Sequence, residues 1–268
     1  MDLGLHSRVA IVTGASSGIG YAIARDLIQE GVKVVLVARD KVRLENASQS
    51  LTKQFDGEVL TIAVDICAPE APEQIINATK ERFGALDILI NNAGRAHAGG
   101  LMESTEDDWN EMTTLKLSSM RRMCRTAIPL LRKSTCGRIV NMSSIGGIYP
   151  NPKLMISHVL SAAICNFTRS LALEEAKYNI LINAIGIGAV ATDNWENNMI
   201  PSVRRERPEL ATLSDAEVLA LVGRESTPVG RVGQPEDIAA IALFLCSARN
   251  NFITGDTVEA SGGADRFM

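Results

Sequence analysis

Three glycines near the amino terminus, Gly14, Gly18 and Gly20, lie in a loop that follows a short apolar run at residues 9–12. A β-branched run of this kind predicts a buried strand, and the segment after the loop has the apolar spacing of a helix. Glycines at such a junction permit a tight turn and let backbone N–H groups approach a pyrophosphate at the positive end of the helix dipole. The sequence therefore predicts a dinucleotide phosphate site here, with contacts from Gly14, Ser16, Ser17, Gly18, Ile19 and Gly20.

The residue after the second predicted strand distinguishes the two nicotinamide dinucleotides. In folds of this type an acidic side chain there accepts hydrogen bonds from the ribose of NAD and repels the 2′-phosphate of NADP. Counting eighteen residues from Gly20 reaches Ala38, and the next residue is Arg39. A guanidinium makes a forked contact with phosphate, so the sequence favours NADP. A solvated Arg39 with NAD as the cofactor is the alternative.

The rest of the chain alternates apolar strands with segments of helical period. This alternation is typical of βαβ units, and it predicts a doubly wound, Rossmann-type α/β fold with three α/β/α layers and about seven parallel strands. We expect strands at 9–12, 33–38, 59–64, 88–91, 138–142, 180–184 and 257–259. We expect a helix that ends near residue 31 and others at 41–55, 72–83, 105–133, 156–177 and from 235. Residues 1–268 are expected to form a single domain, because α/β folds of this size commonly have one core.

Residues 193–227 interrupt the alternation. Polar and charged side chains dominate this stretch, and no strand can be placed in it. So long a segment within a compact domain is usually functional, so we expect a helical lid over a ligand. One or two short helices are expected, the clearest at 215–222. A solvated insertion without a role is the alternative.

Composition narrows the classes of function. The 268 residues are 46% apolar with a net charge of −4, which is ordinary for a soluble globular protein. No uncharged run reaches the roughly 18 apolar residues of a membrane span, and the chain starts without signal-peptide features, so a cytoplasmic location and no membrane contact are expected. The acidic balance predicts no nucleic-acid partner, and the spacing of the five cysteines predicts no metal site.

The loop spacing Gly-x-x-x-Gly-x-Gly resembles that of the short-chain dehydrogenase/reductase family, and the resemblance extends from about Ser7 to Gly263. Asn-Asn-Ala-Gly at 91–94, Asn-Met-Ser-Ser at 141–144 and the segments 228–238 and 253–263 match the family's motifs. The resemblance implies a small-molecule substrate and a homodimer or homotetramer. It also implies further cofactor contacts from Asp65, Ile66, Asn91, Ala93, Gly94, Ser161, Gly188 and Thr192.

The catalytic residues depart from the family's pattern. Members that reduce carbonyls use Asn, Ser, Tyr and Lys, in which Tyr donates the proton and Lys lowers its pKa. Alignment on residues 168–174 and a thirteen-residue count from Ser144 both place Ser157 at the tyrosine position, so Ser161 stands at the lysine position. Lys116 falls at the asparagine position. Only Ser144 of the four is retained.

The one Tyr-x-x-x-Lys string of the chain, from Tyr149 to Lys153, does not repair this loss. It contains Pro150 and Pro152, which exclude a helix and therefore a shared helical face. An alkyl hydroxyl is a far weaker acid than a tuned phenol, and a matched acid contributes about 10²- to 10⁴-fold to the rate. The usual carbonyl reduction is therefore expected to be slow or absent unless another group supplies the proton.

Three rescues are conceivable: a relay from Ser144 and Ser157 through water, the ammonium of Lys116 reaching into the site, or Tyr149 swinging over it. A lysine on the protein surface is the plain alternative for Lys116. His97 follows the Asn-Asn-Ala-Gly motif, which in the family borders the substrate cleft. His158 lies about 100° around the helix from Ser157 and is expected to face solvent or a subunit contact.

Three functions stay open at this point. The first is an NADP(H)-dependent oxidoreductase that acts on a carbonyl or conjugated-alkene substrate, with Ser144, Ser157 and Lys116 as candidate catalytic residues. The second is a catalytically weak or inactive cofactor-binding homologue that acts as an assembly partner or sensor. The third is a non-redox enzyme in the same pocket, for which no residue gives positive evidence.

Overall fold

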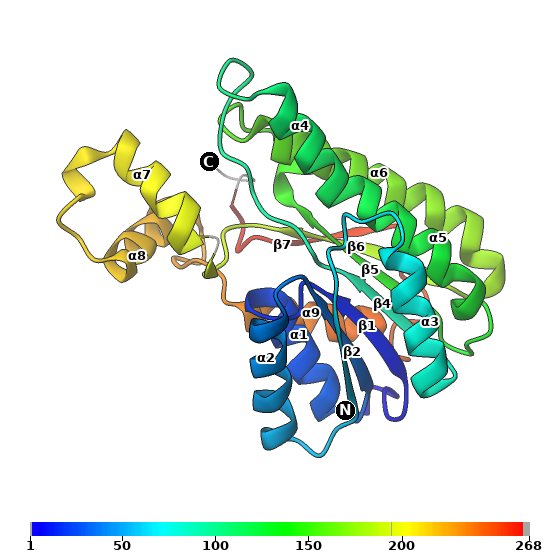
Figure 1. Ribbon diagram of the computed structural model, residues 1–268. Coiled ribbons are helices and arrows are strands. Elements are labelled where there is room, and N and C mark those ends of the chain that lie inside the picture. The colour runs from blue at the N-terminus through cyan, green and yellow to red at the C-terminus, as the bar shows by residue number, and fades with distance from the viewer. Residues whose placement is uncertain (1, 194, 265–268) are drawn as a thin grey trace.

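A parallel sheet of seven strands, in the order β3-β2-β1-β4-β5-β6-β7, forms the centre of the computed structural model, which describes residues 2–193 and 195–264 (Figure 1). The strands are β1 (Val9–Thr13), β2 (Lys33–Ala38), β3 (Val59–Ala63), β4 (Ile88–Asn91), β5 (Arg138–Ser144), β6 (Leu181–Ile187) and β7 (Thr257–Ala260). The strand order reverses between β1 and β4, and ligands of open α/β sheets bind at the carboxyl ends beside such a reversal. The predicted Rossmann-type fold is confirmed.

Helices cover both faces of the sheet. They are α1 (Gly18–Gln29), α2 (Lys41–Gln54), α3 (Ala71–Phe83), α4 (Glu106–Thr113), α5 (Ser119–Leu131), α6 (Met155–Glu175), α7 (Ile200–Glu206), α8 (Asp215–Ser226) and α9 (Pro235–Cys246). One buried cluster joins the sheet to α1, α2 and α9, and another joins it to α3, α5 and α6. Within β1, Ala10 and Val12 belong to the first cluster, whereas Ile11 belongs to the second. Strands buried on both faces read as continuous apolar runs, which is why the sequence located them.

The structure differs from the predicted helices and strands at two places, the helix predicted at 105–133 and the end of strand β5. The helix predicted at 105–133 is divided into α4, a π-helical turn η1 (Thr114–Ser118), and α5. An extra residue in one turn leaves little trace in a hydrophobic pattern, so the sequence did not show it. Strand β5 continues through Ser143 and Ser144, which pair with Gly186 and Ile187 of β6. Polar residues were not expected in a buried strand, yet here they bring a serine to its carboxyl end.

The predicted helical insertion is present. Apart from residue 194, which lies outside the described residues, the stretch 193–227 contains two helices, α7 and α8, and no strand. Figure 1 shows these two helices, in yellow, set to one side of the sheet. They have a small apolar cluster of their own around Ile200, Leu210 and Val218. Over the part of the chain that the structure describes, we find no helix with the length and apolar character of a membrane span.

An ion pair between the ends of α5 and α6 provides a test of the fold. Glu175 is 1% exposed, and it accepts hydrogen bonds from Arg132 Nε at 2.8 Å and Nη2 at 2.6 Å. We expect Arg132→Met to lower the free energy of unfolding by about 2 kcal/mol, because the buried carboxylate loses its cation while the partly exposed arginine moderates the loss. Urea unfolding at neutral pH measures it.

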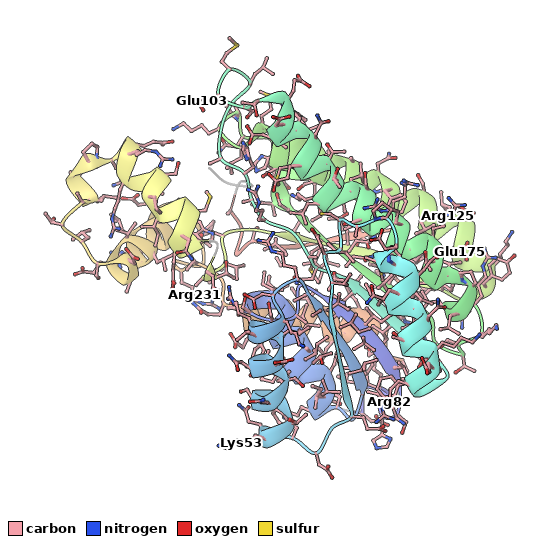
Figure 2. The ribbon with its side chains drawn as sticks, viewed as in Figure 1. Lys53, Arg82, Glu103, Arg125, Glu175 and Arg231 are labelled. Carbon is pink, nitrogen blue, oxygen red and sulfur yellow. The ribbon has the colours of Figure 1, made fainter. Side chains whose placement is uncertain are left out.

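Arg125→Met is the matched control for this variant. Arg125 lies on α5, is exposed, and makes no hydrogen bond or ion pair with the described residues (Figure 2). Its replacement is expected to change the free energy of unfolding by less than about 0.5 kcal/mol. Equal losses in the two variants would contradict the assignment of the Arg132–Glu175 pair.

Candidate active site

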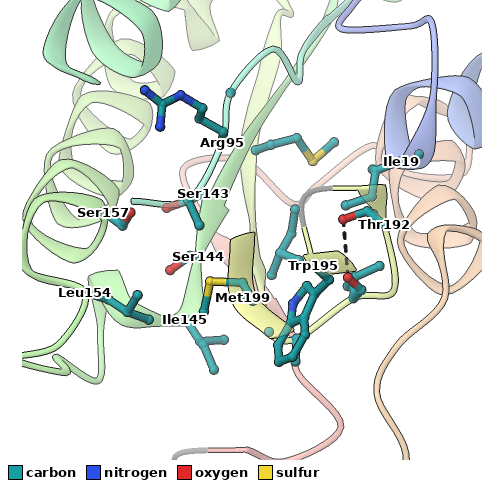
Figure 3. A pocket seen from close by; sticks show the side chains of 18 of the residues that line it. Ile19, Arg95, Ser143, Ser144, Ile145, Leu154, Ser157, Thr192, Trp195 and Met199 are labelled. Carbon is teal, nitrogen blue, oxygen red and sulfur yellow. Dashed lines mark hydrogen bonds between the residues drawn. The ribbon is translucent and has the colours of Figure 1, made fainter. Parts of the chain in front are cut away.

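A cavity of about 480 Å³ opens at the carboxyl ends of the central strands. Its walls come from the glycine loop, the segment after β4, the end of β5, the start of α6 and the insertion at 193–227, which we call the lid after its predicted role. Figure 3 shows Ser144 and Ser157 on one side, Ile19 and Thr192 on the other, and the lid residues Trp195 and Met199 between them. The residues from sequence analysis that line this cavity are Gly14, Ser17, Gly18, Ile19, Ala93, Gly94, Lys116, Ser144, Ser157, Gly188 and Thr192.

The glycine loop has the geometry that a pyrophosphate needs. Gly14 and Gly18 have φ values of +67° and +56°, a region that side chains disfavour. Ser17, the N-cap of α1, makes no side-chain capping bond, and the first turn of α1 carries no acidic residue. The N–H groups of this turn are therefore left to a ligand, and an anion fits them.

Two residues predicted in this loop do not reach the cavity. Gly20 is buried, and a Cβ placed on it would lie 2.3 Å from the carbonyl oxygen of Gly14. Its glycine is therefore a packing requirement of the turn and not a ligand contact. Ser16 is partly buried and also lies outside the cavity lining.

Thr13 and Asn92 fasten the glycine loop to the end of β4. The hydroxyl of Thr13 donates to the carbonyl of Ile90 at 3.2 Å and accepts from the N–H groups of Asn92 at 2.9 Å and Ala93 at 3.0 Å. The amide of Asn92 donates to the carbonyl of Thr13 at 2.9 Å. Sequence analysis named neither as a site residue, although the doubled asparagine was the signal that pointed to this position.

The prediction for Asn91 needs correction. Its side chain is buried in the core, where Nδ2 donates to Oδ1 of Asn141 at 2.9 Å and to Sγ of Cys124 at 3.3 Å. Neighbouring residues of a strand point to opposite faces of the sheet. Asn91 and Asn92 are consecutive, and it is the second that faces the glycine loop.

The predicted contacts for the adenosine half lie beyond the cavity. Arg39 is exposed directly after β2 and Asp65 is exposed after β3, where its Oδ1 accepts from the N–H of Cys67 at 2.9 Å. The side chain of Ile66 is buried against the core, so it does not contact the cofactor as predicted. Arg43, in the first turn of α2, forms an ion pair with Asp193 of the cavity wall, which sequence analysis did not anticipate.

Ser144 keeps its predicted place in the cavity. It ends β5, and its Oγ accepts a hydrogen bond from the N–H of Gly146 at 3.0 Å. A hydroxyl has one proton to donate, and this contact leaves that proton to a group in the cavity. Ser144 is thus able to bind a carbonyl oxygen.

Ser157 has a different role from the one predicted. Its hydroxyl accepts from the N–H of His97 at 2.7 Å and donates to the carbonyl of His97 at 3.2 Å. The single hydroxyl proton is therefore committed to the backbone, which argues against a Ser144–Ser157 relay. Instead Ser157 holds the segment after β4 against α6, where the family has a phenol.

Lys116 approaches the position that the family's lysine would occupy. The turn η1 carries it, and its Nζ lies 3.4 Å from Oγ of Ser161 and 3.4 Å from the carbonyl oxygen of Ser157. Burial disfavours the ammonium and lowers the pKa of Lys116 from 10.5 to about 8. Ser161 is fully buried and outside the cavity lining, so its predicted cofactor contact is corrected: Ser161 Oγ donates to the carbonyl of Ser157 at 2.7 Å and lies beside the lysine.

The Tyr149–Lys153 string forms no helix, as predicted. Among the described residues, neither Tyr149 nor Lys153 lines the cavity, and Nζ of Lys153 pairs with Glu206 of the lid at 2.6 Å. The expectation for His158 was wrong: it is 9% exposed, it lines the cavity, and its Nδ1 accepts from the N–H of Asn151 at 2.8 Å. The segment that contains the string folds over this part of α6, a tertiary contact that helical spacing does not reveal.

Comparison with known proteins identifies the family. A family model described as enoyl-(acyl carrier protein) reductase matches residues 14–265. The 3-oxoacyl-(acyl-carrier-protein) reductase FabG of Vibrio cholerae is 31% identical over 261 residues, which cover 97% of this chain and 98% of that protein. Human dehydrogenase/reductase SDR family member 4 is 30% identical over 263 residues, 97% of this chain and 88% of that protein. This chain belongs to the short-chain dehydrogenase/reductase family and is an oxidoreductase by family.

Two solved structures are similar over nearly the whole chain. The L-sorbose reductase of Gluconobacter frateurii, complexed with NADPH and L-sorbose, superposes with a TM-score of 0.93 at 33% identity and covers 100% of both chains. An NADPH-bound short-chain oxidoreductase of Pseudomonas aeruginosa PAO1, described as containing an atypical catalytic center, has a TM-score of 0.87 at 30% identity over 96% of this chain and 98% of that one. The predicted cofactor, NADP, is the one bound in both.

The Thr13 hydroxyl offers a test of how the glycine loop is held. We expect Thr13→Val to lower the free energy of unfolding by about 2 kcal/mol, because the N–H groups of Asn92 and Ala93 lose their acceptor. The same change at Thr257 is the control, since Thr257 is 8% exposed in β7 and its buried Oγ1 has no partner among the described residues. Thr257→Val should leave stability equal or slightly higher. Chemical unfolding measures both, and similar losses would refute the role of Thr13.

Proposed function

We propose that this chain is an NADPH-dependent reductase of small molecules that carry a carbonyl or a conjugated alkene, with Lys116 as the source of the proton. The observation that carries the proposal is the position of Lys116: it lines the cavity, and its ammonium lies 3.4 Å from the hydroxyl of the buried Ser161. Sequence alignment assigns position 161 to the family's lysine. A cation from the neighbouring helical segment thus stands where the family places one from α6.

The cofactor site supports the first part of the proposal. The N–H groups at the start of α1, together with Gly14 and Ser17, would hold the pyrophosphate, and Arg39 would contact the 2′-phosphate. Gly188 and Thr192 border the opposite end of the cavity. NADPH, when bound, supplies the hydride. The two NADPH-bound relatives of similar fold favour NADPH over NADH.

In this proposal Ser144 and Lys116 together replace the tyrosine and the lysine of the family: Ser144 binds the substrate oxygen and Lys116 supplies the positive charge and the proton. The O–H of Ser144 donates a hydrogen bond to the substrate oxygen and orients the carbonyl. As that oxygen gains electron density, the Lys116 ammonium provides positive charge and then a proton, and the neutral amine recovers its proton from solvent. For a conjugated alkene the same proton goes to the carbon that becomes electron-rich.

Ser157 and His97 are positioning residues in this scheme. The two hydrogen bonds between them close the cavity on the side where a tyrosine ring would stand. They hold the loop after β4 against α6 and reduce the access of water to Lys116. Exclusion of water strengthens the effect of an ammonium on a nearby oxygen.

A catalytically weak or inactive cofactor-binding protein is the second candidate. It is favoured by the lining of the cavity, in which the described residues include no tyrosine, and by the commitment of the Ser157 proton to His97. Tight NADPH binding without turnover on any carbonyl or enone would support it. The homodimer or homotetramer, the single domain across residues 1–268 and the cytoplasmic location stay predictions from the sequence.

Replacement of Lys116 tests the proton source. We expect Lys116→Ala to lower kcat by about 100-fold or more, because the only ammonium that the described cavity lining contains is removed. The dissociation constant of NADPH, measured by fluorescence, should change by less than about threefold, since the phosphate contacts are remote from this residue. Oxidation of NADPH against a panel of carbonyls and enones measures kcat.

Tyr149→Phe is the matched control, because Tyr149 belongs to the string that does not reach the cavity. Its rate should equal that of the unchanged protein. A Lys116→Ala variant with full activity, or a Tyr149→Phe variant without it, would transfer the role of acid from Lys116 to another group.

The pH profile gives a separate test. Burial lowers the pKa of Lys116 to about 8, so the ammonium is present below that pH and is lost above it. A reaction that needs the ammonium as acid should lose kcat as the pH rises through about 8, one unit of pH giving about a tenfold loss. Initial rates at saturating NADPH and substrate measure the profile. If Lys116→Arg, whose guanidinium does not titrate here, shows the same alkaline loss, Lys116 is not its origin.

A further inference from the structure

A second cavity of about 240 Å³ adjoins the first. The segment after β4 forms one wall with Arg95, Ala96, His97 and Ala98, and the lid forms the other with Asn197, Pro201 and Arg205. Arg95 and Ala96 line both cavities, so the two spaces meet at this segment. We call the second space the arginine pocket.

The arginine pocket is lined by cationic and neutral side chains. No carboxylate is among the described residues that line it. Arg205 is exposed and has no hydrogen bond or ion pair with the described residues. Its neighbours on the lid differ: Arg204 pairs with Asp215 at 2.7 Å, and Arg207 pairs with Glu225 at 2.5 Å. Of these three arginines, Arg205 lines the pocket, and it is the one without a carboxylate partner among the described residues.

Arg95 supplies the second cation. One of its nitrogens pairs with Glu111 of α4 at 2.9 Å, and this side chain is labelled at the edge of the main cavity in Figure 3. A guanidinium carries five N–H donors, and a contact with one carboxylate leaves several of them for another anion. Arg95 and Arg205 line the same pocket, and a guanidinium makes forked contacts with a carboxylate or a phosphate.

Hydrogen bonds hold one wall of the arginine pocket, the segment after β4, against the part of α6 that borders the main cavity. Ser157 holds the backbone of His97, and the N–H of Gly99 donates to the carbonyl of Lys153 at 2.8 Å, so the wall with Arg95 is tied to the start of α6. The main cavity has a mixed lining: Figure 3 shows Ser143 and Ser157 between Arg95 and Ser144, and the apolar Leu154 and Met199 on the other side of Ser144. A ligand that spans both spaces meets the hydroxyl of Ser144, this mixed lining and the two arginines.

We propose that the arginine pocket binds an anionic group of the substrate, so that the enzyme prefers oxo compounds in which a short apolar chain ends in a carboxylate or a phosphate ester. This inference rests on the proposed reductase function. It adds a substrate class to it: Ser144 receives the carbonyl, the main cavity, whose lining includes Leu154 and Met199, receives the chain, and Arg205 with Arg95 receives the charge.

Matched substrates test the class. Oxo carboxylates with chains of about four to ten carbons are compared with their methyl esters, and oxo alkyl phosphates of the same lengths with the parent alcohols. At the best length we expect kcat/KM for the charged compound to exceed that for its neutral partner by about tenfold or more. A preference for carboxylate over phosphate, or the reverse, identifies which anion the pocket receives.

Arg205→Gln removes the cation of the lid from the pocket and keeps a side chain of similar length. It should reduce the ratio of kcat/KM between charged and neutral substrates by about tenfold, chiefly through KM. Arg224→Gln is the matched control, because Arg224 is an exposed lid arginine outside the arginine pocket. The control should keep the ratio of the unchanged protein. A ratio near one in the unchanged protein, or equal ratios in the two variants, overturns the inference.

A binding measurement separates this inference from the proposed reductase function. Straight-chain alkanoates have the chain and the charge but no reducible group, and their affinity for the NADPH-loaded protein is measured by calorimetry. We expect Arg205→Gln to weaken alkanoate binding by about tenfold and Arg224→Gln to leave it unchanged. If alkanoate binding depends on Arg205 but no substrate is turned over, the reductase function alone is refuted. If charged and neutral substrates are turned over equally well, and alkanoates bind equally to the unchanged protein, Arg205→Gln and Arg224→Gln, the inference alone is refuted.

Discussion

The hydroxyl of Thr13 is the contact on which the two halves of the site depend. It lies at the carboxyl end of β1, where the strand order reverses, and it takes part in three hydrogen bonds to the end of β4. The glycine loop on one side and the segment that carries Arg95 and His97 on the other both start from this junction. A loosely held junction would separate the cofactor cradle from the wall that receives the substrate. The hydrogen bonds of this one buried hydroxyl therefore fix the end of β1 relative to the end of β4, from which the two walls of the cavity start.

At the end of the cavity that holds Ser144, the cation comes from Lys116, which lies on the neighbouring helical segment and not on α6. Helix α6 carries Ser157 and Ser161, which alignment of the sequence assigns to the family's tyrosine and lysine positions, and the π-helical turn η1 brings Lys116 against Ser161. Ser157 binds the backbone of His97 through both its donor and an acceptor site, so this position of α6 is tied to the loop after β4. In our proposal the proton then comes from an amine whose pKa burial has lowered.

The loop after β4 connects these observations. His97 contacts Ser157 of the catalytic helix, and Arg95, two residues before it, lines both cavities. Ser157 therefore also holds one wall of the arginine pocket. In our proposals, the proton source and the preference for a charged substrate both depend on one packed unit, formed by α6, η1 and this loop.

The sequence by itself determined the fold and the cofactor loop. Strands buried on both faces give continuous apolar runs, and glycines spaced in this way between a strand and a helix are typical of a dinucleotide-binding turn, so local pattern was sufficient for both. Ser157 and Ser161 lie on a helix, α6, as the sequence predicted. The sequence pattern did not predict which of Asn91 and Asn92 faces the glycine loop. A strand that is apolar on both faces has no alternation of polar and apolar residues to show which side chains point to which face.

Only the tertiary structure decided which polar groups meet. Lys116 reaches Ser161 because a π-helical turn rotates it toward α6, and such a turn leaves the hydrophobic period almost unchanged. His158 is buried because the segment before α6 folds back over it. Arg205 and Arg95 line one pocket although the two residues are far apart in the chain. These contacts join distant residues, and their geometry depends on how helices and loops pack, which spacing along a chain does not encode.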